Sequence, residues 1–235
     1  MERLLDEHIE KLKTRVIKMC SLVDEQVQNA IKAVETNDLE LANSVIDRDK
    51  KVNKYDVKID KICQRIFALA QPVAMDLRYI MSSLTINSNL ERIGDIAVNI
   101  AENIILIKTK PGFYINTRLE EMFKLTKQML KNSIDAFIGG NPELAKEVIL
   151  ADDVVDKLNG ENHTILKSIM KQSAENIEAA VALLVISREL ERLADHATNI
   201  AEDVFFIVEA QLIKHKYEKF IFGDEEQEEK NDQGD

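Results

Sequence analysis

The apolar and polar residues of this chain follow one another with the period of an α-helix over most of its length. Around residues 91–104, apolar side chains recur every three or four positions and gather on one side of a helical projection, namely Ile93, Ile96, Ala97, Ile100 and Ile104. No segment alternates with the period of two that a half-buried strand requires. The pattern therefore predicts an all-α protein.

Chain-breaking residues divide the pattern into six helical stretches. Three helices are expected over 2–35, 39–70 and 75–109, separated by Asn37-Asp38 and Pro72 and ended by Pro111-Gly112. Three more helices are expected in the second half. The first begins at a Thr117–Glu120 capping box and ends with a C-cap at Gly139-Gly140. The second begins at Asn141-Pro142, and Ser173 is expected to be a cap between the second and the third. The second set of breaks repeats the arrangement of the first.

One motif occurs twice, 100 residues apart. Glu91-Arg-Ile-Gly-Asp95-Ile-Ala-Val-Asn99-Ile-Ala-Glu102 returns as Glu191-Arg-Leu-Ala-Asp195-His-Ala-Thr-Asn199-Ile-Ala-Glu202. The segment Leu41-Ala-x-x-Val45-Ile46-x-x-Asp49 is likewise matched by Leu144-Ala-x-x-Val148-Ile149-x-x-Asp152, at an offset of 103. We therefore expect two tandem, internally repeated antiparallel three-helix bundles, over residues 1–110 and 113–222. Residues 223–235 have almost nothing to bury and are expected to form a disordered acidic tail.

Composition narrows the class of protein. The formal net charge of −11 argues against nucleic-acid binding, which needs a basic face, and suits cations or basic patches on protein partners. The most apolar run, residues 179–186, is too short to cross a membrane, and the first residues do not resemble a signal peptide. Cys20 and Cys63 lie in different helices without metal-ligand spacing and are expected to be buried thiols.

Polar stripes run along four of the predicted helices. In the first half Glu91, Asp95, Asn99 and Glu102 share one arc of their helix, away from its apolar side, and the preceding helix carries Asp49, Asn53, Asp56 and Asp60. In the second half the stripes are Glu191, Asp195, Asn199 and Glu202, with Asp152, Asp156, Asn159 and His163 on the facing helix. His196 lies off the stripe and is expected to pack or to lie at the surface, and His8 and His215 belong to no cluster.

The facing stripes are predicted to lie at equal heights. When two residues lie level across an antiparallel hairpin, their residue numbers add up to twice the number of the residue at the turn. This index sum is 144 for Asp49 and Asp95 in the first half, and 347 for Asp152 and Asp195 in the second. These index sums centre the hairpins on Pro72 and between Ser173 and Ala174. Carboxylates gathered in this way repel one another unless cations, protons or water intervene, and oxygen-rich clusters suit iron, manganese, magnesium, calcium or zinc.

The polar stripes and the arginines beside them each have an alternative interpretation. A charge stripe is also the usual solvated face of a helix, although four stripes paired by height and repeated in both halves favour metal binding. Arg92 and Arg192, beside the stripes, suit either a carboxylate or phosphate contact or a plain surface salt bridge.

The repeated motif, together with Pro72-Val-Ala-Met-Asp-Leu-Arg78 ahead of its first copy, resembles the PhoU family of phosphate-uptake regulators over residues 5–215. The resemblance implies two three-helix bundles with one multinuclear metal cluster each, iron being expected first and zinc, manganese or magnesium being alternatives. The ligand positions that it implies are Asp49, Asn53, Glu91, Asp95, Asp152, Asp156, Glu191 and Asp195, to which the stripes add Asn99, Glu102, Asn199 and Glu202.

The resemblance also implies a function and a location. Such a protein is cytoplasmic, lies at the inner face of the membrane only through partners, restrains a phosphate ABC transporter through its ATPase subunit, and couples it to a sensor histidine kinase. A homodimer is left open. Two departures put equal metal occupancy of the two halves in question: Asn53 replaces a carboxylate, and Asn176-Ile-Glu178 stands where Asp76-Leu-Arg78 would repeat.

A non-enzymatic regulator is therefore the leading hypothesis, with two rivals. A di-metal carboxylate oxidase or ferroxidase would typically use Glu-x-x-His motifs, and no histidine here follows a glutamate at that spacing. The polar stripes are also expected to be open to water, which suits docking better than O₂ activation. A metal-free helical scaffold is the second rival.

Overall fold

The computed structural model describes residues 2–210, and all of their secondary structure is helical. The six α-helices are α1 (Glu2–Thr36), α2 (Leu39–Ala70), α3 (Ala74–Ile107), α4 (Leu119–Gly139), α5 (Pro142–Gln172) and α6 (Ile177–Glu209). Two short 3₁₀ helices, η1 (Gly112–Asn116) and η2 (Ala174–Asn176), precede α4 and α6. The predicted all-α class and the six helices are confirmed. No helix among the described residues is long and apolar enough to cross a membrane.

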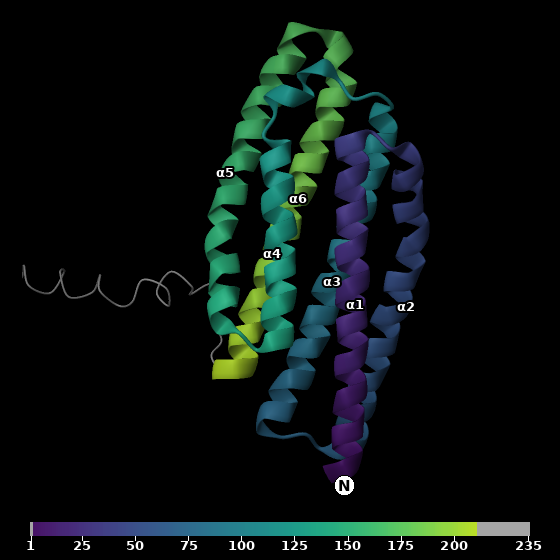
Figure 1. The fold of residues 1–235 in the computed structure, drawn as a ribbon, viewed down its shortest axis with the longest axis vertical. Helices are drawn as coiled ribbons and strands as arrows, with labels where there is room; N and C mark the ends of the chain where they lie inside the picture. The colour runs from purple at the N-terminus through teal and green to yellow at the C-terminus, as the bar shows by residue number, and fades with distance from the viewer. Residues whose placement is uncertain (1, 211–235) are drawn as a thin grey trace, which may run out of the picture.

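The helices form two antiparallel three-helix bundles that lie side by side with their axes nearly parallel (Figure 1). Helices α1–α3 form the first bundle and α4–α6 the second. The most extensive contact between any two helices joins α3 to α6, across the boundary between the bundles. Each copy of the repeated motif therefore lies on a central helix that contacts the other bundle, which the repeat alone did not indicate.

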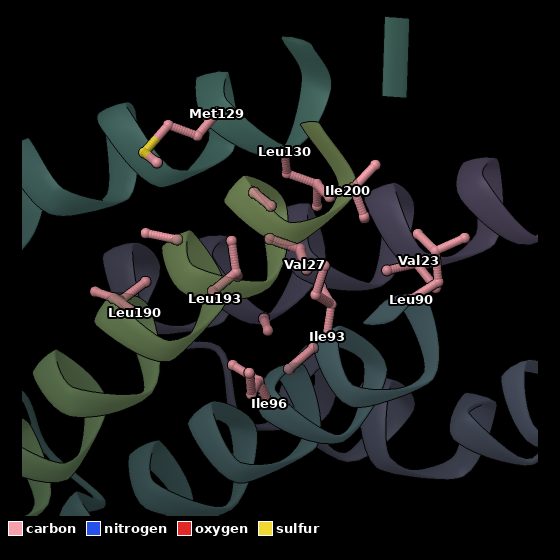
Figure 2. Close-up of a cluster of buried hydrophobic side chains, with 14 of the residues drawn as sticks. Val23, Val27, Leu90, Ile93, Ile96, Met129, Leu130, Leu190, Leu193 and Ile200 are labelled. Carbon is pink, nitrogen blue, oxygen red and sulfur yellow. The ribbon is translucent and has the colours of Figure 1, made fainter. Parts of the chain in front are cut away.

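One hydrophobic core runs through both bundles. Figure 2 shows side chains of α1, α3, α4 and α6 packed together where the bundles meet, among them Val27, Ile93, Leu130 and Leu193. The expected domain boundary falls at the link between Ile107 and Gly112, but the continuous core ties the bundles to one another. The division into domains at 110 and 113 stays a prediction, and the expected tail at 223–235 lies outside the described residues.

Most predicted helix ends agree with the structure. The Asp38 and Asn141 side chains accept hydrogen bonds from the backbone N–H groups of Leu41 and Leu144, and Gly140 has the left-handed φ of 59° that suits a glycine C-cap. Ser173 caps η2 by accepting from the N–H of Glu175. Cys20 and Cys63 are buried free thiols, and burial raises the pKa of each to about 12.

The predicted capping box at Thr117 and Glu120 is wrong. Thr117 ends η1, where its hydroxyl donates to the carbonyl of Tyr114, and α4 begins only at Leu119. The backbone N–H of Arg118 instead donates to Oδ1 of Asn162 on α5, at 2.7 Å. A side chain 44 positions away thus supplies the acceptor that local sequence was expected to provide.

Candidate functional site

The first acidic cluster lies between α2 and α3 and consists of Asp49, Asp56, Glu91 and Asp95. Burial and the charge of Asp95 raise the pKa of Asp49, and burial with the charges of Asp95, Asp56 and Asp49 raises the pKa of Glu91. Carboxylates 35 to 46 positions apart therefore repel one another across the hairpin, near the heights that the index sums predict.

Gly94 lets the two helices of this cluster approach closely. A Cβ at this position would lie 3.1 Å from Cγ1 of Val52 and 3.6 Å from Oδ1 of Asp49. The absence of a side chain on α3 thus leaves room for Asp49 on α2. The second copy of the motif has Ala194 at the matching position.

Neighbouring amides already hold several oxygens of the first cluster. Asn53 donates from Nδ2 to Oδ2 of Asp49 at 2.7 Å, and Gln26 on α1 donates to Oδ1 of the same residue at 3.4 Å. Asn87 on α3 donates to Oδ1 of Asp56 at 2.7 Å and to Oδ1 of Asp60 at 3.2 Å. These bonds stabilise the charged carboxylates and use acceptor sites that a cation would otherwise take.

Gln26 and Asn87 also contact this cluster, although neither was predicted to do so from the sequence. Asn87 lies one turn before Glu91 on the same arc of α3, so helical periodicity would have found it. Gln26 could not be found in this way, because it comes from α1, whose contact with α2 depends on packing.

The second acidic cluster lies between α5 and α6 and consists of Asp152, Asp156, Glu191 and Asp195. Burial and the charges of Asp195 and Asp156 raise the pKa of Asp152 to about 7, and the pKa values of Glu191 and Asp195 are raised as well. Oδ1 of Asp152 and Oε2 of Glu191 are buried without a hydrogen-bond partner among the described residues. The second cluster thus holds more unsatisfied negative charge than the first.

Arginines flank both clusters. Arg92 lies 3.6 Å from Oε2 of Glu91 and 3.8 Å from Oδ2 of Asp95, both long for a salt bridge. Arg188 pairs with Oε1 of Glu191 at 2.8 Å, whereas Arg192 pairs with Glu189 at 2.9 Å. Arg92 is therefore near carboxylates of the first acidic cluster, and Arg192 forms a salt bridge outside the second, so both interpretations of the motif arginines stay open.

The rest of the first stripe lies in different surroundings. Asn99 donates from Nδ2 to Oε2 of the buried Glu189, 3.1 Å away on α6, so it belongs to the interface between the bundles. Glu102 is exposed one turn further along α3. The structure therefore gives these two residues positions apart from the first acidic cluster.

The second stripe converges more closely. Asp152, Asp195, Asn199 and Glu202 line one open hollow of about 470 Å³, together with Arg192, His196 and Thr198. His196 is half-buried and lies 2.9 Å through Nδ1 from Oδ1 of Asn89 on α3, consistent with a packing role. His163 is exposed.

The expectation that the stripes lie open to water is wrong for two residues. Glu202 is 9% exposed and Asn159 is 7% exposed. Asn159 accepts a hydrogen bond from the hydroxyl of Ser187, and α6 packs against α3, α4 and α5 at once. A helix covered on three sides leaves only a narrow strip for solvent, which a single helical projection does not show.

The donor set fits hard or borderline cations, although within residues 5–210 no three His, Cys, Asp or Glu side chains are already placed around one ion position. The donors are almost all carboxylate and amide oxygens, and burial together with like charges raises their pKa values, a repulsion that cations would relieve. The unpartnered oxygens of Asp152 and Glu191 are free to bind such cations.

Comparison with known proteins identifies the family. The family model described as the PhoU domain matches the chain twice, over residues 16–104 and 119–204. The chain belongs to the PhoU family. Both matches contain one acidic cluster each, so the family's repeat coincides with the repeat of the clusters.

Several PhoU relatives match nearly end to end. The phosphate-specific transport system accessory protein PhoU homolog of Aquifex aeolicus is 38% identical over 215 residues, which cover 92% of this chain and 97% of that protein. The accessory protein PhoU of Escherichia coli is 33% identical over 207 residues, covering 88% and 86%. The crystal structure of PhoU from Pseudomonas aeruginosa superposes with a TM-score of 0.84 at 31% identity, over 88% of this chain and 99% of that one.

Proposed function

We propose that this protein is a non-enzymatic regulator of phosphate uptake and of the phosphate-starvation response. Its PhoU relatives are named accessory proteins of the phosphate-specific transport system, and the relative from Streptococcus pneumoniae is called a regulatory protein of phosphate transport. The proposed partners are the ATPase subunit of a phosphate ABC transporter and a sensor histidine kinase. The protein would act in the cytoplasm and reach the membrane through these partners.

The observation that supports a role for the acidic clusters is their repetition at matched heights in both bundles. Each cluster places two carboxylates on each of two adjacent helices, and in each, burial together with like charges raises the pKa values of carboxylates. Metal ions shared by several carboxylates would neutralise this charge and fix the side chains into a defined surface. We propose one multinuclear cluster per bundle, with iron as the first candidate, and docking of the partners at that surface.

Elemental analysis tests the metal part of the proposal. The chain would be purified without chelators or an affinity tag, and the moles of each metal per chain compared with those of a Glu91→Gln/Glu191→Gln variant. Several equivalents of iron, zinc or manganese that fall at least about tenfold in the variant are expected. A Glu7→Gln/Glu178→Gln variant, which changes two exposed glutamates outside the clusters, is the matched control. A wild-type chain that is folded and cannot be loaded with any of these metals would contradict the proposed metal clusters.

Partner binding tests the regulatory part separately. The purified ATPase subunit and the cytoplasmic region of the kinase would be titrated against wild type and variant, with circular dichroism to show that both are folded. Weaker binding by the metal-depleted variant is expected. If wild type and variant bind the partners equally well, the regulatory proposal is kept and the acidic clusters are not needed for docking. If the wild type binds neither partner, the regulatory proposal is wrong.

A further inference from the structure

A lysine-lined groove runs between α1 and α2, on the first bundle only. It encloses about 410 Å³, and its lining includes Lys18, Lys51, Lys54 and Lys58 around Leu22 and Tyr55. All four lysines are exposed. We propose that this groove binds an acidic polypeptide, and that its occupant is the acidic segment of the same chain, residues 224–235.

The lysines of the groove are not held by acidic neighbours within the part of the chain that the structure describes. None of the four lysines forms an ion pair with a described residue. The one acidic residue in the lining, Glu25, is already held by Arg48 at 2.6 Å. The ring of Tyr55 lies 5.3 Å from Nζ of Lys58 and 5.9 Å from the guanidinium carbon of Arg15. In a chain whose net charge is −11, such a concentration of free cations stands out electrostatically.

The groove continues as a basic stripe along α2. The stripe consists of Lys51, Lys54, Lys58, Lys61 and Arg65. At about 100° per residue, these side chains occupy one arc of the helix about 80° wide. This arc is nearly opposite the one that faces the first acidic cluster. At about 1.5 Å per residue the length of the stripe is about 21 Å. An extended chain of six or seven residues covers that length, so a linear polyanion matches the stripe better than a single small anion.

The second repeat lacks the basic stripe, which shows that the fold does not require it. At the offset of 103, the stripe positions are taken by Val154, Lys157, Glu161, Thr164 and Ser168. Glu161 there pairs with Arg118 at 2.8 Å, so the charges of that surface cancel locally. The acidic clusters repeat between the halves and the basic stripe does not, which assigns the groove a separate role.

The acidic segment has the charge that complements the groove. Residues 224–235 contain seven Asp or Glu and one Lys, which gives a net charge of −6, more than half of that of the whole chain. The segment lies outside the described residues. Its carboxylates come in runs, at 224–226 and 228–229, that match lysines spaced three or four positions apart on a helix.

The segment can also reach the groove. Val208, near the last described residue Ala210, lies against Gly140 at the end of α4. One turn before, Phe137 stacks on Tyr79, whose ring lies 5.8 Å from Nζ of Lys13 on α1. The α1 residues of the groove begin at Lys18, so the end of α4 lies about 8–18 Å from the groove along the axis of α1. Crossing from α6 over α4 and α1 to α2 takes roughly 30 Å, and the 14 residues 211–224 span up to about 46 Å when extended.

A second lysine-containing hollow, between α1 and α4, is a poorer match. It contains Lys32, Lys124, Lys127 and Lys131, but also Asp24 and Glu35. Nζ of Lys127 already lies 3.7 Å from Oε1 of Glu35. Its charge is therefore partly neutralised within the described chain, and it serves as the internal comparison in the experiment.

Lysine footprinting on the full chain tests the proposal. Wild type would be compared with a D224N/E225Q/E226Q/E228Q/E229Q variant by limited acetylation and mass spectrometry, in about 20 mM and about 1 M salt. We expect Lys18, Lys51, Lys54 and Lys58 to react about threefold more slowly in wild type at low salt, and equally in both proteins at high salt, because salt screens the attraction. Lys146, Lys157 and Lys167 on α5 should react equally throughout.

A matched variant controls for net charge, since it neutralises five exposed acids elsewhere: Glu120, Asp135, Glu143, Glu147 and Glu178. It should keep the wild-type footprint. Equal reactivity of the groove lysines in all three proteins would overturn the proposal. Slower acetylation that is confined to Lys124, Lys127 and Lys131 would also overturn it. So would slower acetylation that increases with protein concentration, because it would come from a second copy of the chain. The readout involves neither metal nor partners, so its failure is distinct from failure of the proposed function.

Discussion

Asp152 on α5 and Asp195 on α6 face each other across the second hairpin, and the charge of Asp195 is the second largest cause, after burial, of the raised pKa of Asp152. The two residues are 43 positions apart and meet because the helices are antiparallel about the turn at Ser173. With Oδ1 of Asp152 lacking a hydrogen-bond partner among the described residues, this pair is the most strained electrostatic contact of the two acidic clusters.

The stability of the metal-free protein should fall as pH rises from about 4 to about 7. The pKa of Asp152 is about 7 in the folded state, against the ordinary aspartate value of 3.8, so the folded chain binds a proton there that the unfolded chain has released. The favourable contribution is complete below the unfolded value and is lost as pH rises through the folded one. Asp152→Asn should weaken this dependence, to which the other raised carboxylates also contribute, and stabilise the protein at pH 8 by on the order of 1 kcal/mol, after allowing for solvent screening.

Urea denaturation with a chelator present, at about pH 5 and about pH 8, measures this effect. Asp135→Asn, at an exposed position on α4, is the control and should leave the pH dependence unchanged. A wild-type protein that is as stable at the higher pH as at the lower one would contradict the prediction.

Asn53→Asp should increase metal binding in the first cluster. Asn53 now donates a hydrogen bond to Oδ2 of Asp49, and the substitution replaces this donor with another carboxylate ligand. We expect the affinity of this cluster for Mn²⁺ to rise about three- to tenfold in calorimetric titrations, because a fixed negative charge is added beside the ion. Asn43→Asp, at an exposed site on the same helix, adds the same charge away from the cluster. Equal affinities in both variants would show that Asn53 lies outside the metal site.

Asn162→Ala should destabilise the second bundle by about 2 kcal/mol. Asn162 is fully buried, accepts from the backbone N–H of Arg118 and donates to the hydroxyl of Ser187 at 3.1 Å. Truncation removes the acceptor of the Arg118 N–H and one of the hydrogen bonds of the Ser187 hydroxyl, which still donates to Asn159, and it opens a small cavity. Chemical denaturation of this variant beside Gln128→Ala, at an exposed position on α4, provides the measurement. A loss no larger than that of the control would mean that the cap at Arg118 is satisfied by water instead.

Asn99→Ala should cost more stability than Asn199→Ala, although the two residues occupy the same motif position. Asn99 donates to the buried Glu189 across the interface between the bundles, whereas Asn199 is exposed. In metal-free buffer the first substitution should cost about 1–2 kcal/mol and the second less than about 0.5 kcal/mol. Equal losses in thermal unfolding would indicate that the motif asparagines act alike, as ligands or as caps, in both halves.

Periodicity accounts for how much of this structure was predictable. The helix ends at Asp38, Gly140 and Asn141 follow from side-chain capping and from backbone conformations that neighbouring residues dictate. The level pairing of Asp49 with Asp95 and of Asp152 with Asp195 follows from antiparallel hairpins with known turns. The cap at Arg118 was missed because its acceptor comes from another helix.

The sequence by itself determined the six helices, the repeat, the heights of the facing carboxylates and the family. These properties depend on spacing along one chain, which helical geometry converts directly into position. Only the tertiary structure decided that Asn99 bonds to the other bundle, that Glu202 is buried while Glu102 is exposed, that Gln26 joins the first cluster, and that lysines of α1 and α2 form one groove. Each of these properties depends on which neighbouring helix covers a given face of a helix. The packing of α3 against α6 and of α1 against α2 determines this, and it joins residues too far apart in the sequence for a local pattern to predict.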